Sequence, residues 1–578
     1  MIELEKALLK KQPKLKDLPG SKLIFKFLKK LIKEDEINHF IEKNQHLRGF
    51  SFLDKVLEHF NFTYKVTAKS LNNIPAEGRL IIVANHPIGS LDGLALLKMV
   101  RSIRPDVRIV ANELLTHVEA LQSLFLPVEV ISGKATYKTQ YKAMLSVLEN
   151  EEALIIFPAG EVSRIKPNGV RDGRWKSGFL KLAKRTQSSI LPIFVDAKNS
   201  TLFYSLSTVY KPLGTAMLVH EMFNKESQEL RLHVGKAIPW SEIKDSALSY
   251  KKLAKRFRKH LYYLDKKNKK SLFNTVETIA HPARRRALKK ELYDATLLGE
   301  TSDGKKIFLY DYIVDSPVIH EIGRLRELTF RTVEEGTGTA IDIDAYDSDY
   351  RHLVLWDDND LEIVGAYRIA ECNNIVKNKG VKGLYSNTLF EFHDEFQELL
   401  PQAVELGRSF VQPRYWGKRS LDYLWYGIGA YLRQHPEVKY LFGPVSLSQA
   451  YSQEGKEMII SFYQQQFGTK TVMATARRPF TIPITAESTF SGDYKKSYKQ
   501  LNTQLKQLGI KVPTLYKQYA EICEEQGCKF IAFNIDPDFN YCIDSLILVD
   551  LDKLKPKKRE RYIGNATESS SLEDKRVA

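Results

Sequence analysis

The chain has 578 residues, of which 43% are hydrophobic and 27% are charged, and its formal net charge at pH 7 is +17. This length is too great for one hydrophobic core, and the composition is that of a folded globular protein, so we expect two large domains and no long disordered region. The basic excess favours a polyanionic partner, and the charge alone leaves open whether this is nucleic acid, an anionic membrane or an acidic protein.

The four cysteines form no CxxC pair, which argues against a disulfide framework or a zinc site and favours a reducing cytoplasm. The N-terminal residues lack the apolar core and cleavage site of a signal peptide. No stretch of about 18 apolar residues occurs, so a membrane-spanning helix is not expected. Any membrane contact is therefore expected to be peripheral.

Residues 1–60 are expected to form an N-terminal amphipathic helical region. Within it, the segment 22–33 reads KLIFKFLKKLIK. Lys22, Lys26, Lys29 and Lys33 fall on one helical face, and Leu23, Ile24, Phe27, Leu28 and Leu31 fall on the other. Such a helix suits the headgroup layer of an anionic membrane, and it equally suits an ordinary surface helix that packs its apolar side on the domain.

From about residue 63 to 240, short β-rich runs alternate with helical stretches, which predicts an α/β domain with a mostly parallel sheet. The runs are RLIIVANHP, VRIVANE, ALIIFPAG, ILPIFVDA and RLHVGKAIPW. Pro and Gly follow two of these strands directly, at 87 and 89 and at 158 and 160. Open α/β sheets bind their ligands at such strand ends, so the loops there are candidate sites.

The segment IIVANHPIGSLDGLALL predicts a strand, a tight loop and a helix, with His86 and Asp92 at the loop. An imidazole beside a carboxylate is the minimum needed for general-base catalysis, since Asp92 can orient the ring while His86 takes a proton from a hydroxyl. Alone, a His and an Asp six residues apart more often have a structural role. The following loop, FPAGEVSR at 157–164, places Glu161 and Arg164 where they could bind an anionic acceptor.

With RWKSGFLKLA at 174–183 and ILPIFVDA at 190–197, these segments resemble the glycerophosphate and lysophospholipid acyltransferase superfamily over roughly residues 60–245. The resemblance implies transfer of an acyl group from a thioester to a hydroxyl of a lysolipid-like acceptor, with no metal and no covalent enzyme intermediate. In this chain, five residues rather than the family's four separate His86 from Asp92, and Phe-Pro-Ala-Gly replaces Phe-Pro-Glu-Gly. The catalytic pair should survive if the loop bulges.

Residues 251–290 are strongly basic and are expected to form a helical connector, which places the domain boundary between 270 and 300. We therefore expect an O-acyltransferase domain at 61–270 and a second α/β domain at 285–565. In the second domain, the sequence predicts a helix at 321–331, strands at 362–370 and from 403, and a helix at 421–433. A basic, Gly-containing loop before the last helix offers backbone N–H groups to phosphate, although a structural turn explains such a loop equally well.

Taken in order, the segments of about 305–470 resemble acyl-homoserine-lactone synthases and ornithine N-acyltransferases of the GNAT superfamily. The family features carry over to the following positions: Arg326 and Phe330 in LRELTF, Asp342 or Asp344 in IDID, Arg368 in GAYR, and Glu405 and Arg408 in ELGR. The resemblance implies that Glu405 is catalytic, that the other positions bind substrate, and that an acyl carrier protein donates the acyl group to an amino acid. A plain Glu405–Arg408 salt bridge remains the structural alternative.

The two halves together resemble the bifunctional ornithine lipid synthases. The resemblance implies that the C-terminal domain N-acylates an amino acid with a 3-hydroxyacyl thioester, and that the N-terminal domain then O-acylates the 3-hydroxyl of the lyso-lipid. The implied partners are acyl carrier protein (or CoA) thioesters as donors, a small amino acid, a lyso-lipid and an anionic membrane surface on its cytoplasmic face. No cofactor, metal or nucleic acid is expected.

Three alternatives stay open at this stage. The chain could make a glycine lipid or another amino-acid lipid, because no residue identifies the acceptor. It could be a lysophospholipid acyltransferase with a degenerate second domain. It could also be a non-enzymatic, hemolysin-like membrane-binding protein.

Overall fold

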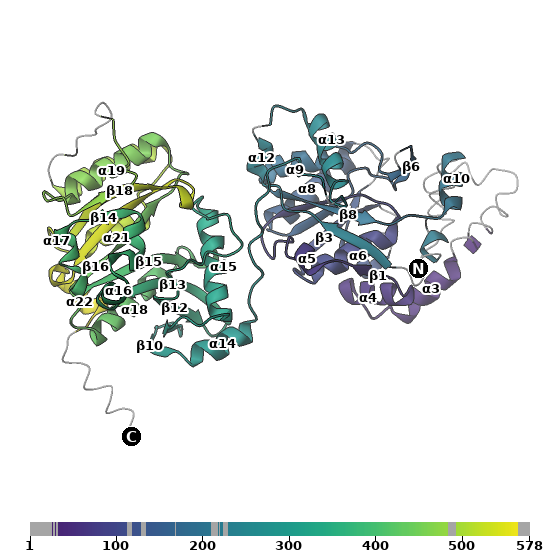
Figure 1. Cartoon of the computed structure of the whole chain (residues 1–578). Helices are drawn as coiled ribbons and strands as arrows, with labels where there is room; N and C mark the ends of the chain where they lie inside the picture. Colours follow the sequence, from purple (N-terminus) through teal and green to yellow (C-terminus); the bar gives the residue numbers. More distant parts are fainter. Residues whose placement is uncertain are drawn as a thin grey trace, which may run out of the picture. The chain divides into compact units, whose positions relative to one another are not determined.

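The computed structural model describes residues 26–564 except 27–28, 31–32, 113–117, 129–133, 168, 210–217, 219, 224–228, 245, 267, 484–489 and 491–492. The expected amphipathic helix at 22–33 lies largely outside the described residues. The chain divides into two compact units, Met1–His281 and Pro282–Ala578. Figure 1 traces both units in sequence colours.

Unit 1 is built on a seven-stranded sheet with the order β1-β9-β8-β2-β5-β3-β4. Its strands are β1 (Thr63–Lys65), β2 (Leu80–Ala84), β3 (Val107–Asn112), β4 (Phe125–Val128), β5 (Ala153–Ile156), β8 (Ser189–Asp196) and β9 (Glu229–Val234). Every neighbouring pair is parallel except β8 with β9. The expected mostly parallel α/β sheet is confirmed.

Helices cover both faces of this sheet, because every side chain of β2 is buried and successive residues point to opposite faces. Leu80 and Ile82 pack with α4 (Gly49–His59) and α6 (Ser90–Arg101), whereas Ile81 and Val83 pack with α9 (Gly178–Thr186) and α13 (Tyr250–Leu261). The helices among the described residues of unit 1 are α3 (Glu34–Lys43), α4 (Gly49–His59), α5 (Ala68–Leu71), α6 (Ser90–Arg101), η2 (Glu119–Leu121), α8 (Lys134–Glu149), α9 (Gly178–Thr186), α10 (Thr201–Val209), α12 (Trp240–Lys244) and α13 (Tyr250–Leu261). A short hairpin, β6 (Arg164–Lys166) with β7 (Gly169–Arg171), lies outside the sheet.

The expected helical connector at 251–290 is helical only at its two ends. Helix α13 ends at Leu261, the next helix begins at Arg285, and the described residues between them are turns and irregular chain. Polar residues of this stretch bond to unit 1 instead of extending a helix: Thr278 Oγ1 donates to Asn73 O at 3.1 Å, and His281 Nε2 is 2.9 Å from Ile74 O. Polar side-chain bonds of this kind compete with helix formation.

Unit 2 is built on an eight-stranded sheet with the order β10-β11-β12-β13-β15-β16-β19-β18. The strands are β10 (Thr296–Glu300), β11 (Lys306–Tyr310), β12 (Arg351–Asp357), β13 (Glu362–Glu371), β15 (Ala403–Val411), β16 (Tyr440–Leu447), β18 (Cys528–Asp536) and β19 (Cys542–Asp550). Only β15 and β16 pair in parallel, over three residues each, and their pairing ends at Glu405 and Phe442. A separate two-stranded sheet joins β14 (Phe390–Phe392) to β17 (Ala474–Ala476).

The helices of unit 2 are α14 (Arg285–Tyr293), α15 (Pro317–Thr332), α16 (Cys372–Lys379), α17 (Asp394–Gln397), α18 (Ser420–Gln434), α19 (Gln453–Phe467), α20 (Tyr494–Gln507), α21 (Thr514–Ile522) and α22 (Pro556–Tyr562). Short 3-10 turns occur at η3 (Val381–Gly383), η4 (Tyr385–Thr388), η5 (Leu400–Gln402), η6 (Pro413–Tyr415), η8 (Pro537–Phe539) and η9 (Leu551–Lys553). The helices expected at 321–331 and 421–433 correspond to α15 and α18, and the strand expected at 362–370 corresponds to β13.

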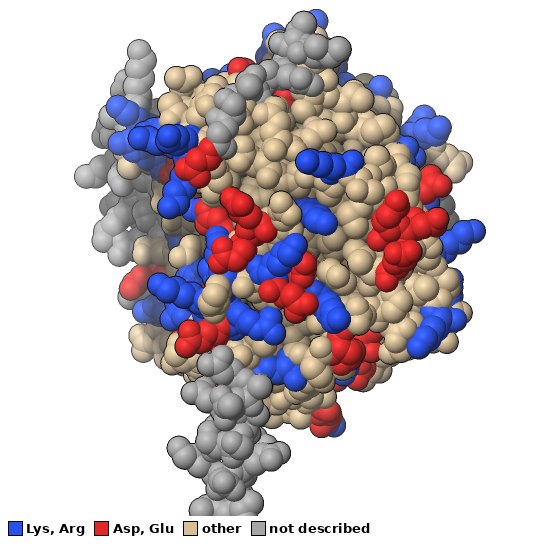
Figure 2. Space-filling view, turned by 90° about the vertical axis from the view of Figure 1, so that its left-hand side faces the viewer, with Lys and Arg blue, Asp and Glu red and all other residues tan. Residues whose placement is uncertain are grey.

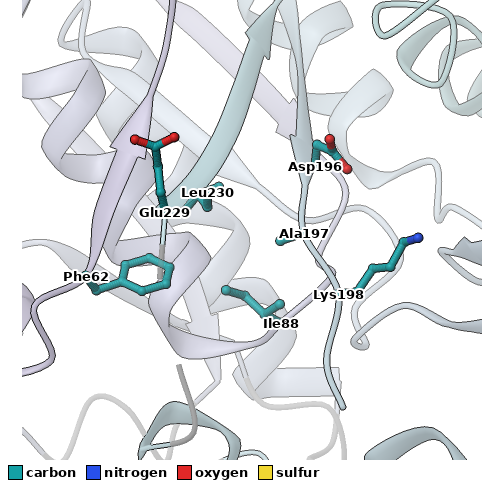
Figure 3. Close-up of a pocket in the computed structure, with 7 residues that line it drawn as sticks. All are labelled: Phe62, Ile88, Asp196, Ala197, Lys198, Glu229 and Leu230. Atoms are coloured by element: carbon teal, nitrogen blue, oxygen red, sulfur yellow. The ribbon is translucent and has the colours of Figure 1, made fainter. Parts of the chain in front are cut away.

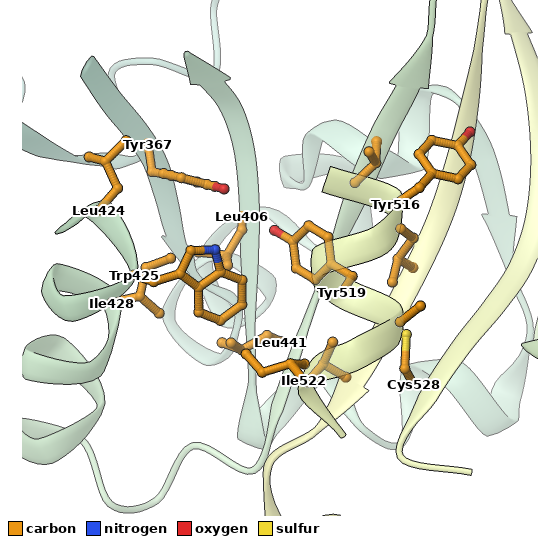
Figure 4. Close-up of a cluster of buried hydrophobic side chains, with 14 of the residues drawn as sticks. Tyr367, Leu406, Leu424, Trp425, Ile428, Leu441, Tyr516, Tyr519, Ile522 and Cys528 are labelled. Atoms are coloured by element: carbon orange, nitrogen blue, oxygen red, sulfur yellow. The ribbon is translucent and has the colours of Figure 1, made fainter. Parts of the chain in front are cut away.

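The largest apolar cluster of unit 2 joins the sheet to α18, α19, α20 and α21. Figure 4 shows Trp425 of α18 and Tyr519 of α21 packed between these helices and the sheet. Their rings are 5.4 Å apart at 66°, an edge-on arrangement that aromatic pairs favour. This core packs against β15 and β16 and holds them in place.

All four cysteines are buried with free thiols. Among the described residues, no helix has both the length and the apolar character needed to cross a membrane. Basic and acidic side chains are interspersed on the face shown in Figure 2.

Candidate active sites

The first site lies at the carboxyl end of β2. His86 Nδ1 is 3.1 Å from Asp92 Oδ1 and 3.2 Å from Oδ2, and the Asp92 side chain is fully buried. The main-chain N–H groups of Ile88, Gly89 and Gly93 all donate to the Asp92 carboxylate, at 3.1, 3.3 and 2.8 Å. The carboxylate is therefore fixed before it meets the imidazole.

Gly89 explains how a five-residue spacing still joins the pair. Its φ of 100° lies in the left-handed region that favours glycine, and it turns the chain directly before α6. Asp92 then sits in the first turn of α6, where the helix dipole favours a negative charge. Asn85, one residue before His86, bonds to the main chain of Val195 on β8 through both ends of its amide, at 2.8 and 2.9 Å.

The surroundings of His86 favour its protonated form. Burial opposes the charge on the ring, but the Asp92 carboxylate, with Asp172 in addition, outweighs burial and raises the pKa of His86. The ring stacks on Phe157 with centroids 4.0 Å apart, which fixes its plane. Because Nδ1 faces Asp92, Nε2 is the nitrogen that can meet a substrate hydroxyl, so the pair can act as an oriented general base.

The loop after β5 lies beside His86, since β2 and β5 are neighbours and Ser163 N donates to His86 O at 2.7 Å. Glu161 is exposed on this loop. Arg164 faces the ring of Phe203 at 5.6 Å, and its buried Nε and Nη1 have no hydrogen-bond partner among the described residues. Of the two expected acceptor-binding residues, Arg164 thus has unused donors for an anion.

Sequence reasoning missed Asp172. This fully buried residue accepts hydrogen bonds from His86 N at 3.2 Å, Ser163 Oγ at 2.5 Å and Trp175 Nε1 at 2.8 Å. It ties together three of the four segments that carry the family resemblance. No local pattern marks it, because it lies 86 residues from His86 in the sequence.

A hollow of about 270 Å³ adjoins the loop that carries His86. It is lined by Phe62, Ile88, Asp196, Ala197, Lys198, Glu229 and Leu230. Figure 3 shows apolar and charged side chains around the same space. Ile88 belongs to the His86 loop, so the hollow adjoins the candidate site.

The second site is a pocket of about 660 Å³ in unit 2. Its lining residues are Thr337, Thr339, Ile341, Asp342, Ile343, Asp344, Tyr346, Tyr385, Thr388, Leu389, Arg408, Arg477, Arg478, Asn534, Ile535, Asp536, Pro537, Asp538 and Phe539. These come from segments far apart in the sequence. The pocket carries both carboxylates and guanidinium groups, which suits a ligand with charges of both signs.

Arg408 is central to this pocket. Its Nε lies 3.2 Å from Asp342 Oδ2, its Nη2 lies 3.2 Å from Asp344 Oδ2, and its Nη1 donates to Tyr385 Oη at 3.0 Å. Its φ of 48° is a left-handed conformation that a long side chain rarely adopts. The residue is thus held in a strained backbone position by its ionic partners, as residues at functional sites often are.

A second layer of buried ion pairs supports Arg408. Arg368 Nη1 is 2.6 Å from Asp344 Oδ1 and 3.4 Å from Asp347 Oδ1, and Arg326 Nη1 is 2.7 Å from Asp347 Oδ1. Asp347, which sequence reasoning missed, joins the two arginines, and despite its burial their charges hold its pKa well below the usual range. Of the expected residues, Asp342, Asp344 and Arg408 line the pocket, while Arg326 and Arg368 lie behind it.

The remaining two expected residues do not line the pocket. Glu405 is 1% exposed and accepts hydrogen bonds from Ser386 N at 2.7 Å, Ser386 Oγ at 2.5 Å and Tyr350 Oη at 2.5 Å. Burial raises its pKa. Phe330 packs against Phe539, a lining residue, at 5.4 Å. The catalytic role of Glu405 stays a prediction, and its observed contacts are with the protein.

Comparison with known proteins places both units. Residues 6–271 match the family described as acyltransferase, and residues 325–426 match the acetyltransferase (GNAT) domain. A glycine N(alpha)-acyltransferase of Bacteroides thetaiotaomicron is 33% identical over 311 residues, which are 51% of this chain and 92% of that relative. A lyso-glycine lipid O-acyltransferase of the same organism is 32% identical over 254 residues, which are 43% of this chain and 91% of that relative. An L-ornithine N(alpha)-acyltransferase of Agrobacterium fabrum is 32% identical over 117 residues, 19% of this chain and 39% of that relative.

Proposed function

Since the chain belongs both to the glycine N(alpha)-acyltransferase family and to the lyso-glycine lipid O-acyltransferase family, we propose that it carries out two successive acyl transfers that build a diacylated amino-acid lipid. Unit 2 joins a 3-hydroxyacyl group to the α-amine of an amino acid. Unit 1 then esterifies the 3-hydroxyl of that lyso-lipid. The observation that carries this proposal is a single chain with an oriented His–Asp pair in one unit and a pocket of mixed charge in the other.

In unit 2, the amine attacks the carbonyl carbon of a thioester, the carbon–sulfur bond breaks, and the thiol leaves. Arg408 and the aspartates around it are suited to a zwitterionic amino acid, because the pocket presents charges of both signs. The parallel pairing of β15 and β16 ends after three residues, which supports an opening where an extended thioester arm could bond to strand edges. The basic loop at 412–420 precedes α18, whose N-terminus suits a phosphate of such an arm.

In unit 1, Nε2 of His86 takes the proton from the 3-hydroxyl as its oxygen attacks a second thioester. Asp92 stabilises the imidazolium that forms, and that proton then passes to the departing thiolate. We assign binding of the lyso-lipid carboxylate to Arg164, a role supported by its Nε and Nη1, which have no hydrogen-bond partner among the described residues. Both products are lipids or lyso-lipids, so the protein would act as a peripheral protein on the cytoplasmic face of a membrane, with acyl carrier protein or CoA thioesters as donors.

Glycine and ornithine are both candidate acceptors. The glycine relative is matched over 92% of its length and the ornithine relative over 39%, which favours glycine as the acceptor. The sequence expectation of ornithine lipid is thus retained as the second candidate.

Purified full-length protein tests the proposal when it is supplied with a 3-hydroxyacyl thioester, a second acyl thioester and either glycine or ornithine. Mass spectrometry should detect a monoacylated amino acid first and the diacylated lipid later, with glycine used in preference. A protein that acylates lysophospholipids but no amino acid would be an O-acyltransferase alone. A protein that acylates neither would contradict the proposal.

A further inference from the structure

Two carboxyl groups, those of Asp536 and Asp544, lie side by side on β18 and β19 of unit 2. In the antiparallel register, Asn534 is opposite Asp544 and Asp536 is opposite Cys542. Alternate residues of a strand point to the same face, so Asp536 and Asp544 are diagonal neighbours on one face. Besides burial, the charge of Asp536 raises the pKa of Asp544, because the two carboxyl groups lie close together.

Asp536 belongs to the wall of the unit 2 pocket, and Asp544 lies behind it, 6% exposed. The turn that follows Asp536 is fixed in two ways. Asp536 Oδ1 accepts from Asp538 N at 2.9 Å, and the Phe539 ring stacks on the Arg408 guanidinium at 4.4 Å. The turn uses Oδ1 of Asp536, so the carboxyl group retains acceptor capacity for the pocket and for Asp544.

The groups that face this pair make it a poor place for two negative charges. Arg408 on β15 is the positively charged group that faces the pair. The other titratable groups around the pair are Glu335 in the loop after α15, Asp538 in the turn, Cys542 on β19, Tyr385 in η4 and Tyr516 in α21. Ser446 lies opposite Asp544 on β16 and donates to Glu335 Oε2 at 2.8 Å. Burial, together with the neighbouring carboxylates, raises the pKa of Asp536 and of Asp544, and burial raises the pKa of Glu335 to about 7. The pair therefore takes up a proton more readily than two solvated aspartates do.

A separate feature of the same pocket indicates a cationic ligand. Asp342 is 3% exposed and lines the pocket, and its Oδ2 accepts no hydrogen bond from the described residues, although Arg408 Nε is 3.2 Å away. A carboxylate oxygen that faces a single guanidinium nitrogen retains a further lone pair, which can accept from a donor of the ligand. An ammonium group offers three N–H donors, which suits a pocket that has both Asp342 and Asp536 in its wall.

We propose that Asp536, supported by Asp544, is the base that removes a proton from the α-ammonium group of the amino-acid acceptor in N-acylation. This inference rests on the proposed function of unit 2. The ammonium loses one proton to the carboxyl pair, and the free amine attacks the thioester carbonyl carbon. The carbon–sulfur bond breaks, the thiolate takes the second proton from the nitrogen, and the pair releases its proton to water. The products are the amide and a free thiol.

The test uses the full chain and measures kcat/KM for N-acylation of glycine with a 3-hydroxyacyl thioester as a function of pH. Asp536→Asn should lower kcat/KM at neutral pH by roughly two to four orders of magnitude, the range of general-base catalysis. The loss should shrink as the pH rises, because more of the amine is then free without help. Asp536→Glu keeps a carboxylate and should restore part of the rate.

Asp544→Asn leaves the turn at Asp536 intact and should lower the rate in the same direction, which keeps the test valid if Asp536→Asn does not fold. Asp552→Asn, an exposed aspartate in η9, is the matched control and should behave as wild type. An equal loss at every pH in both amide variants, or no loss, would overturn the assignment of Asp536. If the wild-type chain acylates no amino acid at all, the proposed function of unit 2 fails, whatever the variants do.

Discussion

Asp172 accepts the main-chain N–H of His86 at 3.2 Å, while Asp92 contacts its ring. One carboxylate thus positions the loop and the other orients the imidazole. Since Asp172 also bonds to Ser163 and Trp175, the loop after β5 and the segment before α9 are fixed by the same group.

Replacing Asp172 with Asn should therefore loosen His86 without removing it. The Asn side chain has an NH2 group in place of one carboxylate oxygen, so it cannot accept hydrogen bonds from His86, Ser163 and Trp175 together. We therefore expect a loss of about 1–3 kcal/mol in the free energy of unfolding of unit 1. For O-acylation of supplied lyso-lipid, kcat should fall by a larger factor than KM rises. Thermal unfolding and O-acylation kinetics check this, with the exposed Glu58→Gln as control. Wild-type values for both would show that Asp172 positions nothing.

The pH profile of O-acylation should report the raised pKa of His86. A general base must be unprotonated, so activity should rise with pH through a midpoint above about 6.5, the usual imidazole value. Asp92→Asn removes the charge that favours the imidazolium, so it should lower both the midpoint and the maximal rate. A midpoint that stays in place in Asp92→Asn would mean that another group controls the profile.

The ionised form of His86 also contributes to stability. Because its folded-state pKa is raised, this contribution is complete below the unfolded value of about 6.5 and is lost as pH rises through the folded value. The difference in free energy of unfolding between wild type and His86→Ala should shrink as pH rises through this range, down to the part that comes from packing on Phe157. A constant difference between the two proteins would contradict the linkage.

Asp347 should stabilise unit 2 strongly, because it neutralises both Arg326 and Arg368 in the interior. Asp347→Asn leaves two buried cations short of a partner, and we expect a loss of about 3–5 kcal/mol. Asp349→Asn, which affects the surface pair with Lys379, should cost about 0–1 kcal/mol. Since the pKa of Asp347 is lowered, its contribution is present above the unfolded value of about 3.9 and is lost as pH falls through the folded value. Chemical unfolding of both variants at neutral pH checks the contrast, and equal losses would contradict it.

The two units should act separately, because each has its own sheet and apolar clusters. A truncated protein that begins at Pro282 should make the monoacylated amino acid and no diacylated lipid. Mass spectrometry of its products checks this division. A folded second unit that makes no monoacylated amino acid, although the full chain does, would show that the division of labour is wrong.

Much of the fold followed from the sequence, because strands such as β2 and helices such as α15 carry strong local patterns of apolar residues. The proximity of His86 and Asp92 was equally local, since six residues and one glycine turn bring them together. Asp172 and the Asp536–Asp544 pair could not be recognised in this way. Their relation to the sites depends on strand pairing and loop contacts between distant segments, which no pattern along the chain encodes.

In the connector at 251–290, the sequence predicted more helix than the structure contains. Its basic residues favoured a helix locally, but Thr278 and His281 bond to the main chain of unit 1, and tertiary contacts prevailed over local propensity.

The most direct test of the central claim is mass spectrometry of the lipids from a host that lacks amino-acid lipids and expresses either wild type or His86→Ala. Wild type should produce the diacylated amino-acid lipid. His86→Ala removes the base of the second step, so the cells should accumulate the monoacylated lyso-lipid and lose the diacylated product by roughly two to four orders of magnitude in rate. Undiminished diacylated lipid in His86→Ala cells would contradict the claim that unit 1 uses His86 to complete the lipid that unit 2 begins.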